Sequence, residues 1–126
     1  MLVREFDADA LAGLREAVLG YATACGMPED RAIDVMLAVH ELAANVVHHG
    51  PGHGRLLLHV TAGTLQCEVS DPGPARRDGT APWPVEQGHG LWLVQMTADH
   101  VRVTSGPHGS LITVVFTLNA GLPGGS

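Results

Sequence analysis

A carboxylate and an amide lie one helical turn apart in an otherwise apolar stretch, His40 to Gly50. Residues four apart lie one above the other on a helix, so Glu41 and Asn45 form one polar pair. His48 and His49 follow about a turn further along the same side. A buried carboxylate is costly unless something compensates it. We therefore favour a ligand site over the alternative, a satisfied polar pair at the solvent edge of the helix.

Two turns that contain glycine follow this stretch. Asp71-Pro72-Gly73 ends an apolar strand, and Gly88-His89-Gly90 precedes a helix. Such residues are common in turns, so each signal alone is weak. A carboxylate at a strand end can nevertheless accept a hydrogen bond from an exocyclic amine such as that of adenine, and free N–H groups at a helix start attract phosphate. An acid, an amide and two such turns indicate a nucleotide site.

The charged residues exclude several alternatives. All seven basic residues are arginine. Without lysine the chain can contain neither a Walker A loop nor a eukaryotic-type protein kinase site. Backbone amides, a metal and Arg76 or Arg77 are the candidates for holding a triphosphate. A zinc protease motif fails because position 44 is Ala44, and a formal charge of −6 without a basic stripe argues against nucleic acid as a partner.

Length and composition fit one ordinary globular domain, with 126 residues and 45% hydrophobic residues. No apolar run approaches the roughly 20 residues that cross a bilayer, and the first residues do not resemble a signal peptide. We expect a cytoplasmic protein that does not enter the membrane. Cys25 and Cys67 are isolated, so we expect two reduced thiols used in packing.

Hydrophobic periodicity predicts the elements that position these residues. The predicted order is strand, helix, helix, strand, strand, long loop, helix, strand, strand, which indicates an antiparallel or mixed sheet with helices on one face. The predicted ranges are a strand at 2–6, helices at about 11–25 and 28–49, strands at 55–62 and 65–70, a loop at 72–87, a helix from about 91 to 98, and strands at 101–103 and 111–118.

Three motifs in this order resemble the N, G1 and G2 boxes of the GHKL, or Bergerat-fold, ATP-binding superfamily. They are Glu41-x-x-x-Asn45-x-x-x-His49, Asp71-x-Gly73 and Gly88-x-Gly90-Leu91-x-Leu93-Val94. The resemblance covers nearly the whole chain and is strongest to small anti-sigma-factor serine/threonine kinases of bacteria. It implies an α+β fold, a Bergerat-type two-layer α/β sandwich whose mixed, mostly antiparallel sheet is covered on one face by three helices. It also implies a single ATP-binding domain at 1–119 and a disordered tail at 120–126.

The resemblance implies ATP and Mg²⁺ as cofactors and a role for each matching residue. Glu41 would be the catalytic base toward the attacking hydroxyl, and Asn45 would hold the magnesium. Asp71 would bind the adenine amine. The other matching residues would contact the nucleotide, with residues 74–87 as the lid: Gly73 at the base, and Gly88, His89, Gly90 and Leu91 at the phosphates.

The chain departs from the family pattern in two places. Ala75 replaces a second glycine of the G1 box, and the usual Gly-Thr pair of the last strand is Gly109-Ser110, with Thr113 three residues later. We take Thr113 as the adenine-side candidate and keep Ser110 open as the alternative.

The function that the resemblance implies is an ATP-dependent protein serine/threonine kinase. It would phosphorylate an anti-anti-sigma protein of the STAS type and, when free, sequester a sigma factor, and a homodimer is a further expectation. The alternative is a non-catalytic module in which ATP or ADP shapes a surface that captures a regulatory protein. Glu41 favours the kinase, because a nucleotide switch needs no base.

Overall fold

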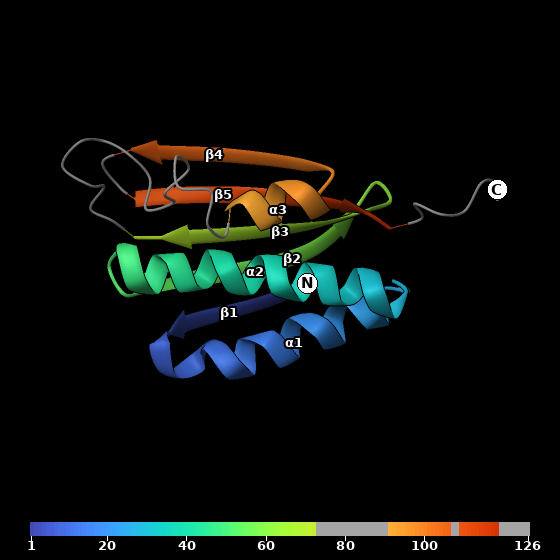
Figure 1. The fold of residues 1–126 in the computed structure, drawn as a ribbon, viewed down its shortest axis with the longest axis horizontal. Helices are drawn as coiled ribbons and strands as arrows, with labels where there is room; N and C mark the ends of the chain where they lie inside the picture. Colours follow the sequence, from blue (N-terminus) through green and yellow to red (C-terminus); the bar gives the residue numbers. More distant parts are fainter. Residues whose placement is uncertain (73–90, 107–108, 119–126) are drawn as a thin grey trace.

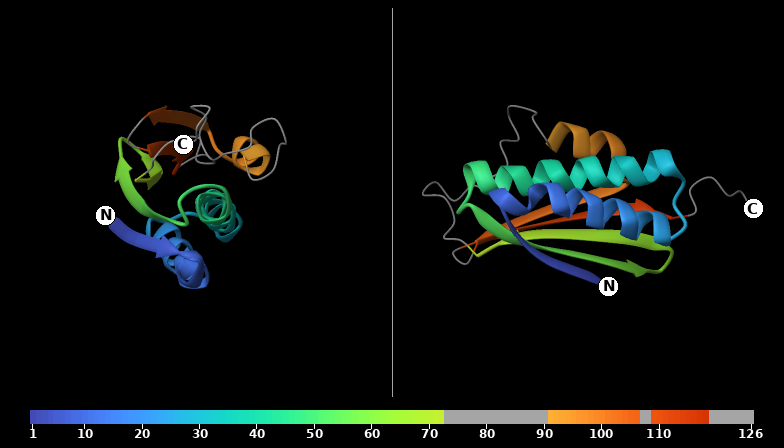
Figure 2. Two further views of the ribbon diagram at one scale, coloured as in Figure 1. Left: turned by 90° about the vertical axis from the view of Figure 1, so that its left-hand side faces the viewer. Right: turned by 90° about the horizontal axis from the view of Figure 1, so that it is seen from below.

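A computed structural model describes residues 1–72, 91–106 and 109–118. In these ranges one β-sheet forms the first layer, and the helices form the second layer on one of its faces (Figures 1 and 2). The elements are β1 (Leu2–Asp7), the 3₁₀ turn η1 (Ala8–Ala10), α1 (Leu11–Ala24), α2 (Glu29–His49), β2 (His53–Thr61), β3 (Thr64–Asp71), α3 (Leu91–Thr97), β4 (His100–Gly106) and β5 (Gly109–Thr117). The predicted α+β sandwich is confirmed.

The strand order is β1-β2-β3-β5-β4, and every neighbouring pair is antiparallel. The predicted hairpin between the second and third strands is present. Its turn residues Ala62 and Gly63 both have positive φ, 53° and 77°. A type I′ turn, which matches the twist of the two flanking strands, requires positive φ at both of its central residues. This hairpin sets the register of β2 on β3, and β5 then continues the sheet.

The starts of the two long helices follow the sequence signals. Asp7 accepts hydrogen bonds from the backbone N–H groups of Asp9 and Ala10 at 3.0 and 3.1 Å, so it caps the turn that leads into α1. α2 begins directly after Pro28, with Glu29 and Asp30 in its first turn, where the helix dipole favours negative charge. Both helices therefore start where the sequence predicts.

The core lies between the sheet and the helices. β3 and β5 alternate strictly between buried and half-buried positions, so every second side chain faces the helix layer. Their inward rows are apolar except at one end, where β3 finishes at Asp71 and β5 begins near Ser110. Both of these polar residues are buried. The apolar residues of the two rows are Leu65, Cys67, Val69, Ile112, Val114 and Phe116.

Both cysteines are free, as predicted. Cys67 is fully buried in the core, and this burial raises the pKa of its thiol. Cys25 is half-buried after α1, and burial raises its pKa as well. Both thiols therefore stay protonated and act in packing.

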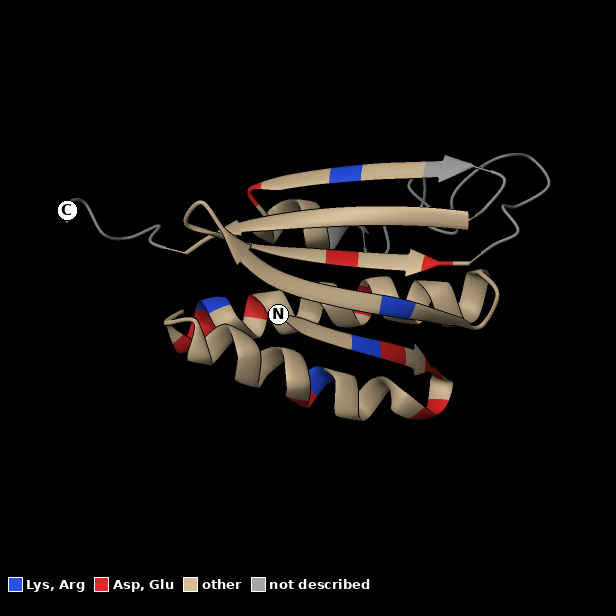
Figure 3. Ribbon diagram, turned by 180° about the vertical axis from the view of Figure 1, so that it is seen from behind, with Lys and Arg blue, Asp and Glu red and all other residues tan. Residues whose placement is uncertain are grey.

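Charge is dispersed over the described part of the chain. The five arginines in these ranges lie on five different elements, and Figure 3 shows positive and negative positions interspersed over the helices and the sheet. Within residues 1–72, 91–106 and 109–118, no helix is both long enough and apolar enough to cross a membrane.

Candidate functional site

Three chain segments that are distant in sequence meet at one end of the sandwich. The C-terminal half of α2, the end of β3 and the start of β5 all lie at this end (Figure 1). α2 also packs against β2, β3 and α3. The fold therefore brings the helix with Glu41 and Asn45 to the same end as the strand that finishes at Asp71.

Asn45 is buried in the apolar part of α2, with 7% of its surface exposed. Its neighbours Leu42, Ala43 and Val46 are completely buried. Among the described residues, the side-chain nitrogen of Asn45 has no hydrogen-bond partner. A buried polar group without a partner costs about 1–3 kcal/mol. The amide is therefore poorly suited to a purely structural role and well suited to a ligand.

Glu41 lies one helical turn before Asn45 and is half-buried. The four-residue spacing places both side chains along the same side of α2. Because Glu41 is half-buried and Asn45 is buried, the pair leads from the surface into the protein. This arrangement could present a carboxylate to a group that arrives from solvent and an amide to a group that lies deeper.

Asp71 and Ser110 form the second half of the site. They are direct partners in the register of β3 and β5, and their exposed fractions are only 7% and 5%. The Cβ atoms of directly opposite residues lie about 4.5–5.5 Å apart. The hydroxyl of Ser110 has no hydrogen-bond partner among the described residues. A carboxylate and a hydroxyl thus lie side by side at the end of the core.

The structure does not bring Thr113 to this place. Thr113 is the register partner of Glu68, three residues before Asp71, and an odd offset places it on the opposite face of the sheet. The alternative that the sequence left open, Ser110, is the residue beside Asp71. Strand register is set by pairing between distant segments, and the sequence pattern did not specify it.

Gly54 is a positioning residue that the sequence analysis missed. A Cβ atom at this position would lie 2.5 Å from the Ser70 carbonyl oxygen, 2.8 Å from Phe6 Cζ and 3.2 Å from Val46 Cγ1. Only glycine lets β2 pass this close to its neighbours, and Val46 is the residue next to Asn45. A glycine inside a strand is the available signal, but we predicted that the strand starts one residue later.

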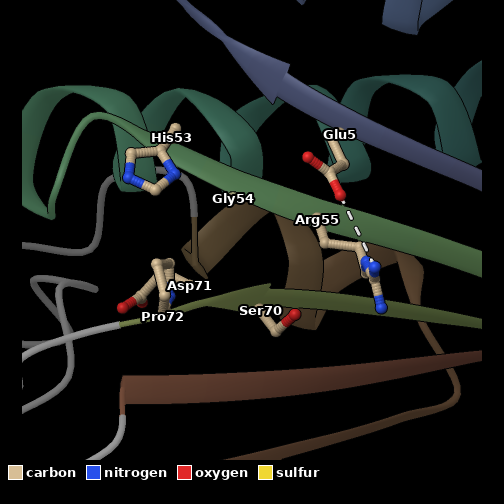
Figure 4. A pocket seen from close by; sticks show the side chains of 7 residues that line it. All are labelled: Glu5, His53, Gly54, Arg55, Ser70, Asp71 and Pro72. Atoms are coloured by element: carbon tan, nitrogen blue, oxygen red, sulfur yellow. Dashed lines mark hydrogen bonds and ion pairs between the residues drawn. The ribbon is translucent and has the colours of Figure 1, made fainter.

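A cavity of about 340 Å³ opens at the same end of the sheet (Figure 4). Its wall includes the exposed ion pair between Glu5 and Arg55, whose charged atoms are 3.5 Å apart. Of the predicted site residues it touches only Asp71, so it is not by itself the nucleotide site. The lining residues are Glu5, His53, Gly54, Arg55, Ser70, Asp71 and Pro72.

Several predicted features lie outside the described residues. They are the candidate site residues Gly73, Gly88, His89 and Gly90, the expected lid at 74–87 and the expected tail at 120–126. Leu91 is the first residue of α3, which packs on α2. The described part of the site therefore consists of Glu41, Asn45, Asp71 and Ser110, with the backbone of Leu91 on the adjacent helix.

Residues 5–116 match the family model of the histidine kinase-like ATPase domain. The chain belongs to this family. The predicted GHKL superfamily is thus confirmed, and the chain is an ATP-binding domain of the GHKL type with an ATPase- or kinase-like fold. A search of curated proteins finds no match.

Solved structures show the same fold. The RsbU and RsbW domains of Rv1364c from Mycobacterium tuberculosis align over 94% of this chain and 32% of theirs, with a TM-score of 0.70 and 16% identity. The histidine kinase domain of the blue-light activated kinase EL346 from Erythrobacter litoralis aligns over 88% of this chain and 60% of its own, with a TM-score of 0.62 and 20% identity. This chain thus spans less than two thirds of the length of either structure.

The histidine kinase AdeS from Acinetobacter baumannii aligns over 94% of this chain and 68% of its own, with a TM-score of 0.56 and 13% identity. At these identities the three similarities concern the fold alone.

Proposed function

We propose that this chain is a Mg-ATP-dependent protein kinase that phosphorylates a serine or threonine of a regulatory partner. One observation carries the proposal. A buried side-chain amide, whose nitrogen has no hydrogen-bond partner among the described residues, lies one helical turn from a half-buried carboxylate, at the same end as the end of β3 and the start of β5. These are the groups that a metal-bound triphosphate, an attacking hydroxyl and an adenine each require.

Asn45 fits a magnesium ligand. Its side-chain oxygen is a hard donor of the kind that Mg²⁺ prefers, and Mg²⁺ is usually bound by only one or two protein ligands together with phosphates and water. The ion would neutralise the charge of the triphosphate when bound. The chain's part would be to hold the amide inside a packed helix, in which Leu42, three residues before Asn45, and Val46, the residue after it, are completely buried.

Asp71 and Ser110 would recognise the adenine. A carboxylate accepts a hydrogen bond from the exocyclic amine, and the neighbouring hydroxyl can donate to or accept from the ring edge. Their burial limits competition from water for these hydrogen bonds. Gly73 would line the base. Ser110, and not Thr113, would be the residue that forms the adenine-side hydrogen bond.

The phosphates would be held without lysine. We assign them to the backbone amides of Gly88, His89, Gly90 and Leu91, since free N–H groups before a helix attract anions. The segment 74–87 would form the lid over the nucleotide.

Glu41 would act as the base. Its half-buried position, one turn before the magnesium ligand, would let a substrate hydroxyl from solvent meet the carboxylate close to the triphosphate. A well-placed base contributes about 10²- to 10⁴-fold to a rate. A non-catalytic switch would not require this carboxylate.

The partner we propose is an anti-anti-sigma protein of the STAS type, with a sigma factor as a second partner and a homodimer as the assembly. This assignment rests on the resemblance of the three motifs to the anti-sigma kinases. The fold shared with a structure that contains an RsbW domain agrees with it.

The test compares Glu41→Gln with Glu16→Gln, an exposed glutamate on α1. With labelled ATP and a STAS-type partner, the wild type and Glu16→Gln should transfer phosphate to serine or threonine. Glu41→Gln should bind Mg-ATP normally and be slower by about 10²- to 10⁴-fold. If the wild type binds the partner in an ATP-dependent way but leaves it unphosphorylated, the non-catalytic module is correct instead.

A further inference from the structure

A cluster of polar contacts lies at the end of the molecule opposite the candidate site (Figure 1). Arg31, in the first turn of α2, donates a hydrogen bond from Nη1 to the Thr97 carbonyl oxygen at 2.9 Å. Its Nη2 lies 3.4 Å from Asp99 Oδ2, and its guanidinium carbon lies 5.4 Å from the centroid of the Phe116 ring. One side chain therefore contacts the end of α3, the segment after it and β5.

Asp99 completes the cluster. Its Oδ2 accepts a hydrogen bond from the Thr117 backbone N–H at 2.6 Å, and its own N–H donates to the Val115 carbonyl oxygen at 2.9 Å. The hydrogen bond from Thr117 and the nearby Arg31 lower the pKa of the Asp99 carboxyl, against the opposing effect of partial burial. We call Arg31, Asp99 and the backbone of Thr97 and Thr117 the α3 clamp.

The α3 clamp helps to hold α3 in its position on α2. This helix has only seven residues, too few to be stable by itself. Among the described side chains of α3, Val94 is completely buried and anchors the helix to the core. The clamp holds the C-terminal end of α3, at Thr97. α3 rises about 1.5 Å per residue, so Leu91 lies roughly 9 Å from the clamped end. A tilt about Val94 would therefore move Leu91.

We propose that Arg31 and Asp99 are positioning residues for the nucleotide site, which they serve by fixing the orientation of α3 on α2. The inference rests on the proposed function, in which the backbone of Leu91 contacts the phosphates. The clamp touches neither Asp71 nor Ser110, so it should matter for the phosphates and not for the base. Arg31 and Asp99 are 68 residues apart in the sequence, and neither belongs to the three motifs.

The experiment measures the affinities for Mg-ATP and for adenosine by calorimetry, well below the unfolding temperature. Arg31→Gln keeps the aliphatic stem but loses the charge, so α3 should be correctly oriented in only part of the molecules, and apparent affinity falls with that fraction. Mg-ATP should bind about tenfold more weakly, which is a fraction of roughly one tenth. Adenosine should bind as to the wild type.

Three further variants define the coupling. Asp99→Asn should weaken Mg-ATP by a similar factor, and the double variant should be no worse than either single one, because the two residues act together. Arg31→Lys keeps the charge but loses the forked guanidinium group that reaches both Thr97 and Asp99. Its affinity for Mg-ATP should therefore lie between those of the wild type and Arg31→Gln. Arg15→Gln, the same change at an exposed arginine of α1, should leave both affinities unchanged.

Two results would overturn the inference while leaving the proposed function intact. In the first, Arg31→Gln lowers the unfolding temperature but binds Mg-ATP like the wild type, which makes the clamp purely structural. In the second, adenosine and Mg-ATP weaken equally, which indicates general loosening. Failure of the wild type to bind Mg-ATP would instead contradict the proposed function itself.

Discussion

The two ends of the sandwich differ in how their polar side chains are partnered. At the clamp end, Arg31 and Asp99 are paired with each other and with backbone groups of α3 and β5. At the site end, the Asn45 amide nitrogen and the Ser110 hydroxyl have no hydrogen-bond partner in the described part of the chain. Folding stability explains the first arrangement and gains nothing from the second. The difference separates polar groups kept for the fold from polar groups kept for a ligand.

The largest expected effect tests this comparison at Asn45. Replacing the amide with leucine should reduce Mg-ATP affinity on the order of a hundredfold or more, since losing even an outer-shell partner of a metal costs 10–100-fold. The same change should stabilise the fold by about 1 kcal/mol, because a buried group without a partner is removed. Calorimetry and urea unfolding measure the two quantities.

Gln66→Leu, on the open face of the sheet, is the matched control and should leave Mg-ATP binding unchanged. An Asn45→Leu variant that binds nucleotide normally, or that is strongly destabilised, would remove the distinction between the two ends.

A second prediction concerns the close approach at Gly54. Gly54→Ala should destabilise the fold by about 2 kcal/mol, because the new methyl group would overlap the Ser70 carbonyl and the Phe6 ring. Gly13→Ala on α1, where the methyl group meets no atom within 4 Å, should gain up to about 1 kcal/mol from helix propensity. Equal urea midpoints for the two variants would show that the approach at Gly54 is not tight.

A third prediction separates the two faces of β5. Ser110→Ala should weaken both adenosine and Mg-ATP about fivefold, as expected for one hydrogen bond of about 1 kcal/mol. Thr113→Ala should weaken neither, because Thr113 lies on the opposite face. If calorimetry shows that Thr113→Ala weakens binding and Ser110→Ala does not, Thr113 is the residue that contacts the adenine.

The smallest expected effect is the pH dependence of the clamp. The pKa of Asp99 is lowered in the folded protein, so its ionised form stabilises the fold at pH values above its unfolded pKa of about 3.9. That contribution is lost as the pH falls through the lower folded value. Asp99 is partly exposed, so the effect should stay below about 1 kcal/mol.

Urea unfolding of the wild type and Asp99→Asn between pH 6 and 3 measures this difference. The advantage of the wild type should be present at pH 6 and shrink toward pH 3. An advantage that grows on acidification would mean that the carboxyl is stabilised in its protonated form.

The sequence was sufficient for the parts of this account that depend on local pattern. Helical periodicity and the four-residue spacing predicted that Glu41 and Asn45 share one side of a helix, and the structure confirms that α2 carries both. The fold class and the superfamily followed from three motifs in order, and both are confirmed.

What the sequence did not supply depends on pairing between distant segments. The choice between Ser110 and Thr113 required the register of β5 on β3. The contact of Arg31 with Asp99 spans 68 residues and has no local signature. The tight approach at Gly54 could not be predicted, because it involves three other segments, those of Phe6, Val46 and Ser70. Local preference determines the elements, whereas long-range packing determines which side chains meet.

A crystal structure with magnesium and a non-hydrolysable ATP analogue would show directly whether the nucleotide binds at Asn45 and Asp71. Our account predicts that the nucleotide lies at the site end, with the side-chain oxygen of Asn45 about 2.1 Å from the metal ion and the adenine amine within hydrogen-bond distance of Asp71. A nucleotide bound elsewhere, or a metal ion that Asn45 does not contact, would contradict it.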